Sequence, residues 1–367
     1  METALTTVIP LPDSVPLAAP PTLFWGLLLL TFFLHLIPMN LVLGGSVILV
    51  VNRFRGGGEV LSSALNPVVK WFPVVVAAAV SFGVAPLLFV QVLYGRLLYT
   101  SSVLIGWAWW LVIPVLILAY YGVYYSAFRS GEKGRGLRWV GLGSAAGFLL
   151  IGFTLSNNMS LMLRPEQFLS IYRADPSGWN LNWSDPTLIP RYLHMLIGSI
   201  GVSGMALALT GYCCRRSCGE NAIWMMRQGG FWFLIATVLN FLVGTWFLLS
   251  YDAVVLRAFM SQGAAALLPL VAGIILGLIA LAVVFLDSQR PEPGIGIPVG
   301  SAILALTLIA MILVRDQIRQ AALASVFEPA SWTVPQWGAI SIFFVLLLAA
   351  VVTVLWMLTR GSRNGSS

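Results

Sequence analysis

Long apolar runs separated by short polar segments make up most of the chain. Nine runs reach about 20 residues, the length that an α-helix needs to cross the hydrocarbon core of a bilayer. We therefore predict an all-α, polytopic transmembrane bundle of about nine spans. The runs cover approximately residues 23–51, 69–95, 101–127, 137–158, 188–213, 229–250, 263–286, 297–314 and 337–359.

The composition supports a membrane protein. Hydrophobic residues make up 59% of the chain and charged residues 9%, whereas soluble domains contain about 25% charged residues. The formal net charge is +7, but the basic residues are scattered through short loops, as expected for orientation signals rather than for a nucleic-acid surface. We expect the lipid bilayer as the surroundings and no nucleic-acid partner.

The distribution of basic residues predicts the orientation. With the N-terminus outside, thirteen of the 20 basic residues fall on the inner side and seven on the outer side. Lys and Arg favour the cytoplasmic side of short loops. We therefore expect an N-terminus outside and a C-terminus inside, in a multi-pass protein of the bacterial inner membrane.

The same pattern divides the chain into three parts. Residues 1–22 are predicted to be an exported tail, since they lack the basic start of a signal peptide. Residues 23–286 are expected to form a seven-span bundle. Its longest outer connection, residues 158–187, mixes Trp and charged residues and suits an interfacial position. Residues 287–367 are expected to add two spans and a cytoplasmic tail.

One stretch carries the strongest candidate site: DPTLIPRYLHMLIGSIGVSGMALALTG, residues 185–211, with His194. On a helix, Gly198 and Gly201 share the face of His194, and Arg191 lies one turn earlier. A haem could use this nitrogen as an axial ligand, the glycines as a flat wall and the arginine for its propionates. The alternative is a histidine bonded to the backbone of a neighbouring helix, with glycines that allow close helix packing.

His35, the second of two histidines, lies at a similar predicted depth. It is 18 residues from Arg53, or about 27 Å of helix, while His194 is 21 residues from Arg215, or about 31 Å. Both are therefore expected in the outer leaflet. Pro38 frees the carbonyl of Leu34, and this carbonyl could hold the His35 imidazole in place of any haem.

Acidic residues are expected only at the ends of spans. Asp252, Asp287 and Asp316 fall at or just past the predicted ends. A proton-coupled carrier normally needs an acid inside the membrane, so this pattern argues against such a carrier. The sequence also lacks a CxxCH motif for covalent haem c.

The order of motifs resembles the large, haem-carrying subunit of cytochrome bd quinol oxidases over roughly the first 265 residues. The resemblance is carried by HLIPMNLVLGG (residues 35–45), SFGVAPLLFVQVLYG (81–95), FTLSNNMSLMLRP (153–165), DPTLIPRYLHMLIGSIGVSGMAL (185–207) and LRAFMSQG (256–263).

The resemblance implies specific cofactor ligands. His194 and Met260 would hold a low-spin haem b, and His35 would ligate a second haem. Arg191 and Arg257 would face propionates.

Two departures separate the chain from that family. Residues 105–118 and 334–346 contain no acid, although the family has glutamates for oxygen reduction in the corresponding helices. The long quinol-binding loop is also missing, because only residues 250–262 join the sixth and seventh spans. We therefore assign no catalytic residue.

These observations predict a membrane-bound b-type cytochrome that transfers electrons through haem near the outer face. It would belong to a respiratory complex with other membrane subunits, and a c-type cytochrome or quinone would be its redox partner. Two alternatives stay open: a divergent bd-type terminal oxidase, and a haemless integral subunit or carrier.

Overall fold

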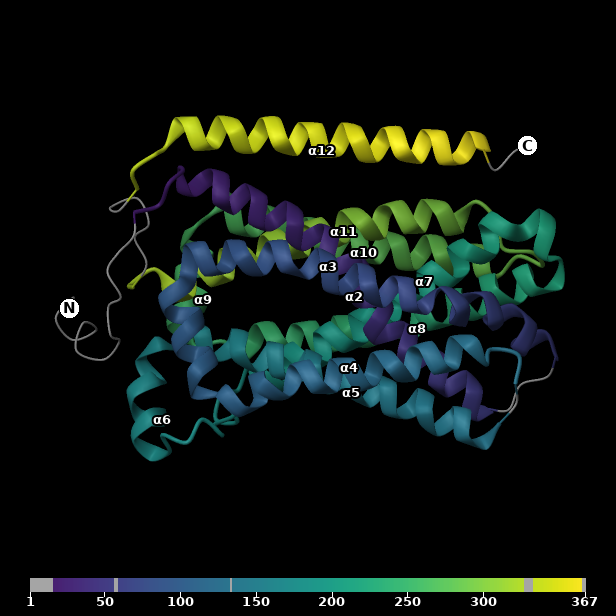
Figure 1. The fold of residues 1–367 in the computed structure, drawn as a ribbon, viewed down its shortest axis with the longest axis horizontal. Coiled ribbons are helices and arrows are strands. Elements are labelled where there is room, and N and C mark those ends of the chain that lie inside the picture. The colour runs from purple at the N-terminus through teal and green to yellow at the C-terminus, as the bar shows by residue number, and fades with distance from the viewer. Residues whose placement is uncertain (1–15, 56–58, 133, 327–332, 365–367) are drawn as a thin grey trace.

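A computed structural model describes residues 16–55, 59–132, 134–326 and 333–364. Within these residues, nine helices are long and apolar enough to cross a membrane, and the only β-type pairing is an isolated bridge between Leu17 and Thr333. The predicted all-α, nine-span architecture is therefore confirmed (Figure 1). The nine helices are α2 (Pro21–Arg55), α3 (Glu59–Leu104), α4 (Gly106–Phe128), α5 (Arg135–Met162), α7 (Leu188–Cys218), α8 (Glu220–Leu249), α10 (Ala264–Ser288), α11 (Gly296–Leu323) and α12 (Trp337–Asn364).

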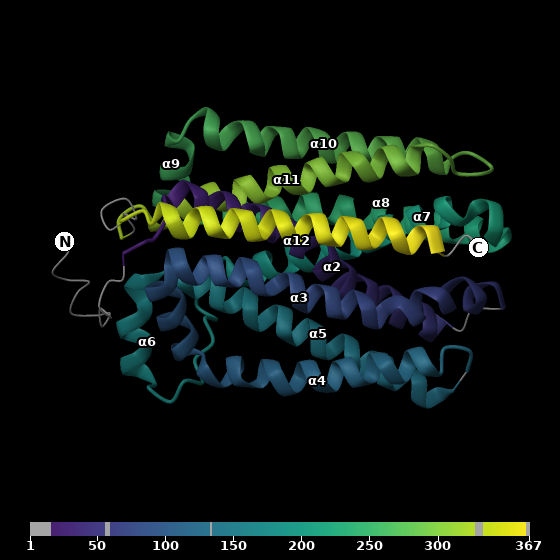
Figure 2. The same cartoon turned by 45° about the horizontal axis from the view of Figure 1, so that its top comes forward.

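Short helices cap one end of the bundle. The helix α6 (Phe168–Ala174), preceded by the 3₁₀ turn η1 (Pro165–Gln167), and the helix α9 (Ala253–Ser261) lie at the same end in both views (Figures 1 and 2). The helix α6 runs across the bundle axis, as an interfacial segment should. This is the end predicted to face outward, and the orientation stays a prediction. Residues 1–15 of the predicted tail lie outside the described part of the chain.

The eighth membrane helix continues beyond the apolar run that the sequence predicted as a span. The expected span was residues 297–314, whereas α11 continues to Leu323 and contains Asp316 and Arg319, which are 5% and 7% exposed. Asp316 lies 20 residues after Gly296, or about 30 Å of helix, which is the thickness of the hydrocarbon core, so its place at the end of the span stays a prediction. Hydropathy ends a span at the first charges, but Asp316 and Arg319 form an ion pair that reduces the cost of keeping both in the helix.

The helices form two similar four-helix units. The first unit contains α2, α3, α4 and α5, and the second contains α7, α8, α10 and α11. In each unit the first helix packs against the second and the fourth. The third helix also packs against the second and the fourth. Figure 2 shows α10 with α11 on one side of the bundle and α4 with α5 on the opposite side. Because α11 also contacts α2, the eighth span is part of the same bundle.

The two units join where α2 contacts α7. A Cβ added to Gly44 would lie 2.0 Å from the carbonyl oxygen of Ser199, and the Ser203 hydroxyl donates to the Asn40 carbonyl at 2.9 Å. The two contacts correspond to each other when the halves are aligned. Adding 159 to a residue number in α2 gives the equivalent position in α7, so position 40 corresponds to 199 and position 44 to 203. The contact of 44 with 199 is therefore equivalent to the contact of 203 with 40. Such an exchange is the signature of a two-fold axis. The same shift carries His35 onto His194, since 194 − 35 = 159.

The ninth span stands apart from both units. None of its residues from Trp337 to Met357 is buried, and Figure 1 shows α12 alone along one edge of the bundle. Its leading segment is tied to the chain before α2 by two backbone hydrogen bonds, from Val334 N–H to the Leu17 carbonyl at 2.9 Å and from Gln336 N–H to the Ala18 carbonyl at 2.8 Å.

Gly44→Ala tests the contact between α2 and α7. The added methyl group cannot fit against the Ser199 backbone, so the helices must move apart. Overpacking of a well-packed core costs about 1–3 kcal/mol, and we expect a loss at the upper end of this range, seen as a lower melting temperature of the detergent-solubilised protein. Gly26→Ala is the matched control, because no atom lies within 4 Å of a Cβ at Gly26 on the same helix. Equal melting temperatures for the two variants would contradict the close contact.

Candidate functional site

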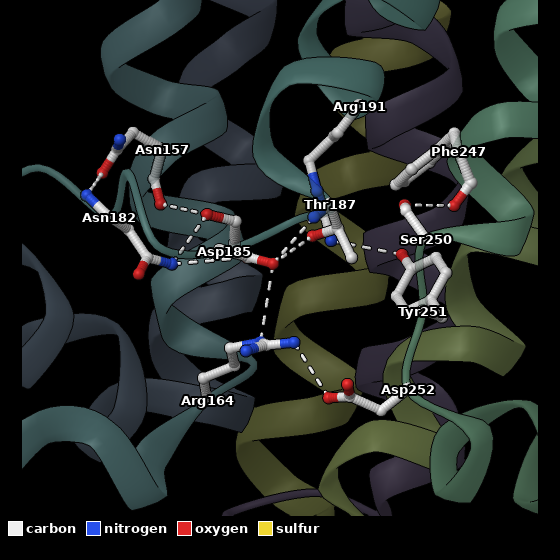
Figure 3. Close-up of polar contacts among 11 residues, drawn as sticks. Asn157, Arg164, Asn182, Asp185, Thr187, Arg191, Phe247, Ser250, Tyr251 and Asp252 are labelled. Atoms are coloured by element: carbon white, nitrogen blue, oxygen red, sulfur yellow. Dashed lines mark hydrogen bonds and ion pairs between the residues drawn. The ribbon is translucent and has the colours of Figure 1, made fainter.

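Asp185 is the polar centre of the segment that leads into α7 (Figure 3). Its buried carboxylate accepts hydrogen bonds from the Thr187 backbone N–H and hydroxyl, both at 2.9 Å, and from the Asn182 amide at 3.3 Å. The backbone N–H of Asn182 donates to the Asn157 side chain at 3.2 Å. An Asp side chain that accepts from the backbone N–H two residues later orders a turn, and here this turn comes just before α7. These bonds therefore fix the beginning of α7 against the end of α5.

Arg164 connects this centre to α9. Its Nε lies 3.5 Å from the Asp185 carboxylate, and its Nη2 lies 2.9 Å from the Asp252 carboxylate. One guanidinium therefore bridges two acids that precede two different helices (Figure 3). The side chain of Arg164 is only 15% exposed and that of Asp185 only 1%. Their ion pair is therefore screened by water less than an ordinary surface ion pair.

Arg191, one turn before His194, has no acidic partner among the described residues. Its Nη2 donates to the Tyr251 hydroxyl at 3.2 Å, and its guanidinium carbon lies 5.2 Å from the centre of the Phe247 ring. Its Nε is buried without a hydrogen-bond partner. Burial raises the pKa of Tyr251, so the phenol stays neutral and leaves the charge of Arg191 uncompensated.

The His194 imidazole lies against α8. A Cβ added to Gly244 would lie 3.0 Å from Cε1 and 3.1 Å from Nδ1 of this ring. The Phe247 ring centre is 6.1 Å away, and the Asn240 backbone, one turn before Gly244, also lies beside the imidazole. Nδ1 is buried and makes no well-formed hydrogen bond with any of the residues that the structure describes. Because buried polar atoms normally have partners, this nitrogen needs an explanation.

Gly198 and Gly201 also face α8. A Cβ at Gly198 would lie 3.2 Å from the Asn240 amide nitrogen, and one at Gly201 would lie 3.5 Å from the Ala236 Cβ. The glycine face therefore contacts side chains of α8 at ordinary or close distances. This arrangement corresponds to the helix-packing interpretation of the two glycines.

The His35 imidazole lies against α3 in a corresponding way. A Cβ added to Gly83 would lie 2.9 Å from Cε1 and 3.1 Å from Nδ1 of the ring. Nδ1 is 3.0 Å from the carbonyl oxygen of Ala79. If Nδ1 carries the proton and donates it to this carbonyl, Nε2 keeps its lone pair. The carbonyl beside His35 thus comes from Ala79 of α3 rather than from Leu34 of its own helix.

The two histidines share one arrangement. Each ring lies on a glycine of the following span, Gly83 or Gly244, and beside the backbone of the residue four positions earlier. Gly83 and Gly244 could not be recognised from the sequence, because a lone glycine in an apolar span carries no signal of which side chain lies against it. The internal similarity of the two halves also became visible only through these contacts.

Met260 and Arg257 lie on α9, away from this arrangement. Met260 is 54% exposed, and Phe259 is the α9 side chain that is buried. Arg257 is exposed, and its Nε donates to the Ala253 carbonyl of its own helix at 3.2 Å. The residues that surround the His194 ring come from α8 instead.

The sequence interpretation missed a charged cluster on α11. The Asp316 carboxylate accepts from Arg319 and, at 2.7 Å, from Gln320. The Arg319 guanidinium lies 4.8 Å from the centre of the Tyr94 ring, and Arg315 lies 4.3 Å from that of Phe32. Three charges within five residues, spaced to share a helix face, were the available signal.

Comparisons with known proteins give a match in structure alone. No protein-family model matches the chain, and neither does any curated protein sequence. Among solved structures, the chain is similar to the bd oxidase from Geobacillus thermodenitrificans, with a TM-score of 0.64 over 93% of this chain and 97% of that one, at 13% sequence identity. Together with the nine apolar helices, this likeness makes the chain a multi-pass membrane protein whose fold is similar to that of bd oxidase.

Proposed function

We propose that the protein is a b-type cytochrome subunit that passes electrons through haem near the outer face of the bacterial inner membrane. It would work within a respiratory complex, beside other membrane subunits, with a c-type cytochrome or quinone as redox partner. The observation that carries this proposal is the arrangement shared by His35 and His194, in which an imidazole is positioned on a glycine of the next helix.

The two histidines fit the role of haem ligands. A ligating histidine usually donates its other ring N–H to a carbonyl or carboxylate, and the bond from His35 Nδ1 to Ala79 at 3.0 Å has this form. At His194, the buried Nδ1 also lies on the side of the ring that faces α8, beside the Asn240 backbone. When bound, haem b supplies one-electron redox chemistry. The chain supplies the ligands, their orientation and an apolar environment.

Space for the macrocycle has to be created. Two cavities among the described residues measure about 40 and 10 Å³, and neither is lined by His35 or His194; such volumes hold only a few waters. Haem at either histidine therefore requires neighbouring side chains or helices to move. A role of Met260 as the sixth ligand would also require α9 to turn its exposed side chain inward.

A divergent terminal oxidase is the second candidate function. It gains support from Asp316, since a buried acid on a membrane helix could serve proton delivery. However, both Asp316 oxygens already have partners, in Arg319 and Gln320. A carboxylate held in this way stabilises an arginine rather than relaying protons, so we place electron transfer first.

His194→Ala and His35→Ala test the haem proposal. Each substitution removes one axial nitrogen, so each should abolish about one haem b per chain. Pyridine haemochrome content and reduced-minus-oxidised spectra of the purified full-length chain measure the loss. Thr210→Ala is the control, because its exposed hydroxyl bonds only to its own helix. Spectra unchanged by both histidine substitutions in folded protein would refute the ligand assignment.

Oxygen consumption separates the two candidate functions. If electron transfer is the function, the purified protein should reduce oxygen with quinol slowly, with at most a small cyanide-sensitive rate. Rapid cyanide-sensitive turnover that is lost in Asp316→Asn would instead establish the oxidase. Gln317→Ala, at the next position of α11, controls for damage to the helix.

A further inference from the structure

A cavity of about 40 Å³ lies inside the first four-helix unit, between α2, α3, α4 and α5. This volume holds a few waters. Most of its walls are apolar, among them the rings of Phe72 and Phe148, and none of its lining residues is acidic. The polar side chains that line it are Ser46 and Arg53 of α2, Ser126 of α4 and Ser144 of α5.

The cavity lies near the end of the bundle opposite α6 and α9. The helix α2 ends two residues after Arg53, and α4 ends two residues after Ser126; both helices run toward that end (Figure 1). Tyr125 and Trp139, which neighbour the cavity in sequence, are exposed. Exposed Tyr and Trp near helix ends are typical of the headgroup level of a bilayer. Arg53 is half-buried, so the cavity connects this level with the interior of the unit.

Arg53 has no acidic partner in the part of the chain that the structure describes. Its Nη1 donates to the Leu137 carbonyl at 3.0 Å and lies 3.5 Å from where a Cβ on Gly141 would be. A guanidinium has five N–H donors and no acceptor. Within residues 16–55, 59–132, 134–326 and 333–364, its other donors form no hydrogen bond. The positive charge of Arg53 is therefore uncompensated beside the cavity.

Two hydroxyls face the same space. Ser126 is 7% exposed, and its Oγ is buried without a hydrogen-bond partner among the described residues. The Ser144 hydroxyl packs directly on Gly122, one turn before Ser126 on α4. Buried hydroxyls normally have partners. A ligand in the cavity would provide an acceptor for Ser126 within reach of Arg53.

The second unit fills the equivalent place with a side chain. The shift of 159 residues that relates α2 to α7 carries Ser46 onto Met205. Met205 is 2% exposed and packs with Phe233, Ala280 and Val284 in the core of its unit. The four-helix architecture therefore does not require a cavity here. The cavity of the first unit results from its small and polar residues.

We propose that Arg53, Ser126 and Ser144 bind the oxygens of a phosphate group. Arginine matches phosphate in charge and geometry, and its hydrogen bonds to phosphate oxygens are charge-assisted. The group could belong to an anionic phospholipid or be free phosphate. The apolar walls and the place at headgroup level favour the phospholipid, whose phosphate would enter the cavity past Arg53 while its remainder stays at the surface. The site is separate from both histidines and does not depend on haem.

The test is a ligand titration of the delipidated, full-length chain in detergent, followed by calorimetry. The two probes are a short-chain phosphatidylglycerol and inorganic phosphate. Arg53→Gln should weaken binding about 10- to 100-fold, as expected when a hydrogen bond to a charged group is lost, and Arg53→Lys should retain part of it. Ser46→Met keeps the charge but fills the cavity with the side chain that the second unit uses, so it should also abolish binding. Arg55→Gln is the matched control, because Arg55 is exposed and does not line the cavity.

The results separate the two sources of the phosphate. Binding of phosphatidylglycerol alone, lost in Arg53→Gln or in Ser46→Met but kept in Arg55→Gln, identifies a phospholipid site. The same pattern with inorganic phosphate identifies a site for the free anion. If the wild-type chain binds neither probe, or if both cavity variants bind as tightly as the Arg55→Gln control, the cavity holds water only and the proposal is overturned.

Discussion

The contact between α2 and α7 determines how the rest of the bundle is arranged. Gly44 lies so close to the Ser199 backbone that no side chain fits between the helices, and the Ser203 hydroxyl bonds to the Asn40 carbonyl beside it. In a membrane the hydrophobic effect does not drive helices together, so small residues and interhelical hydrogen bonds at such contacts stabilise association. The contact also brings the two histidine-bearing helices together at the axis that relates the two halves.

Charges follow a second constraint, because the low-dielectric interior requires a partner for each of them. Arg164 with Asp185 and Asp252, and Arg319 with Asp316, meet this requirement through direct ion pairs. Arg191 and Arg315 rely on aromatic rings and a phenol instead. These two cations, which have no ion-pair partner in the described part of the chain, and both histidines lie on the helices α2, α7 and α11, which contact one another.

The likeness to a bd oxidase concerns architecture, since 13% identity is compatible with different chemistry on one fold. What this chain could do depends on its own residues. Its two histidines sit on glycines of neighbouring helices, while Met260 and Arg257 remain on the exposed side of a short helix at the end of the bundle. In the proposed cytochrome, the haem ligands would therefore come from the transmembrane helices.

The sequence alone determined the number of spans and the helical class, because the cost of placing a residue in lipid depends mainly on that residue and its immediate neighbours. It also singled out His35 and His194 as candidate ligands. It could not determine where α11 ends, because Asp316 and Arg319 are stabilised by each other, which a hydropathy window does not register. It also could not identify Gly83 and Gly244 as the residues against which the two histidine rings lie. Those assignments depend on which helix faces which, and that is decided only when close contacts such as Gly44 with Ser199 fix the rotation of each helix in the folded bundle.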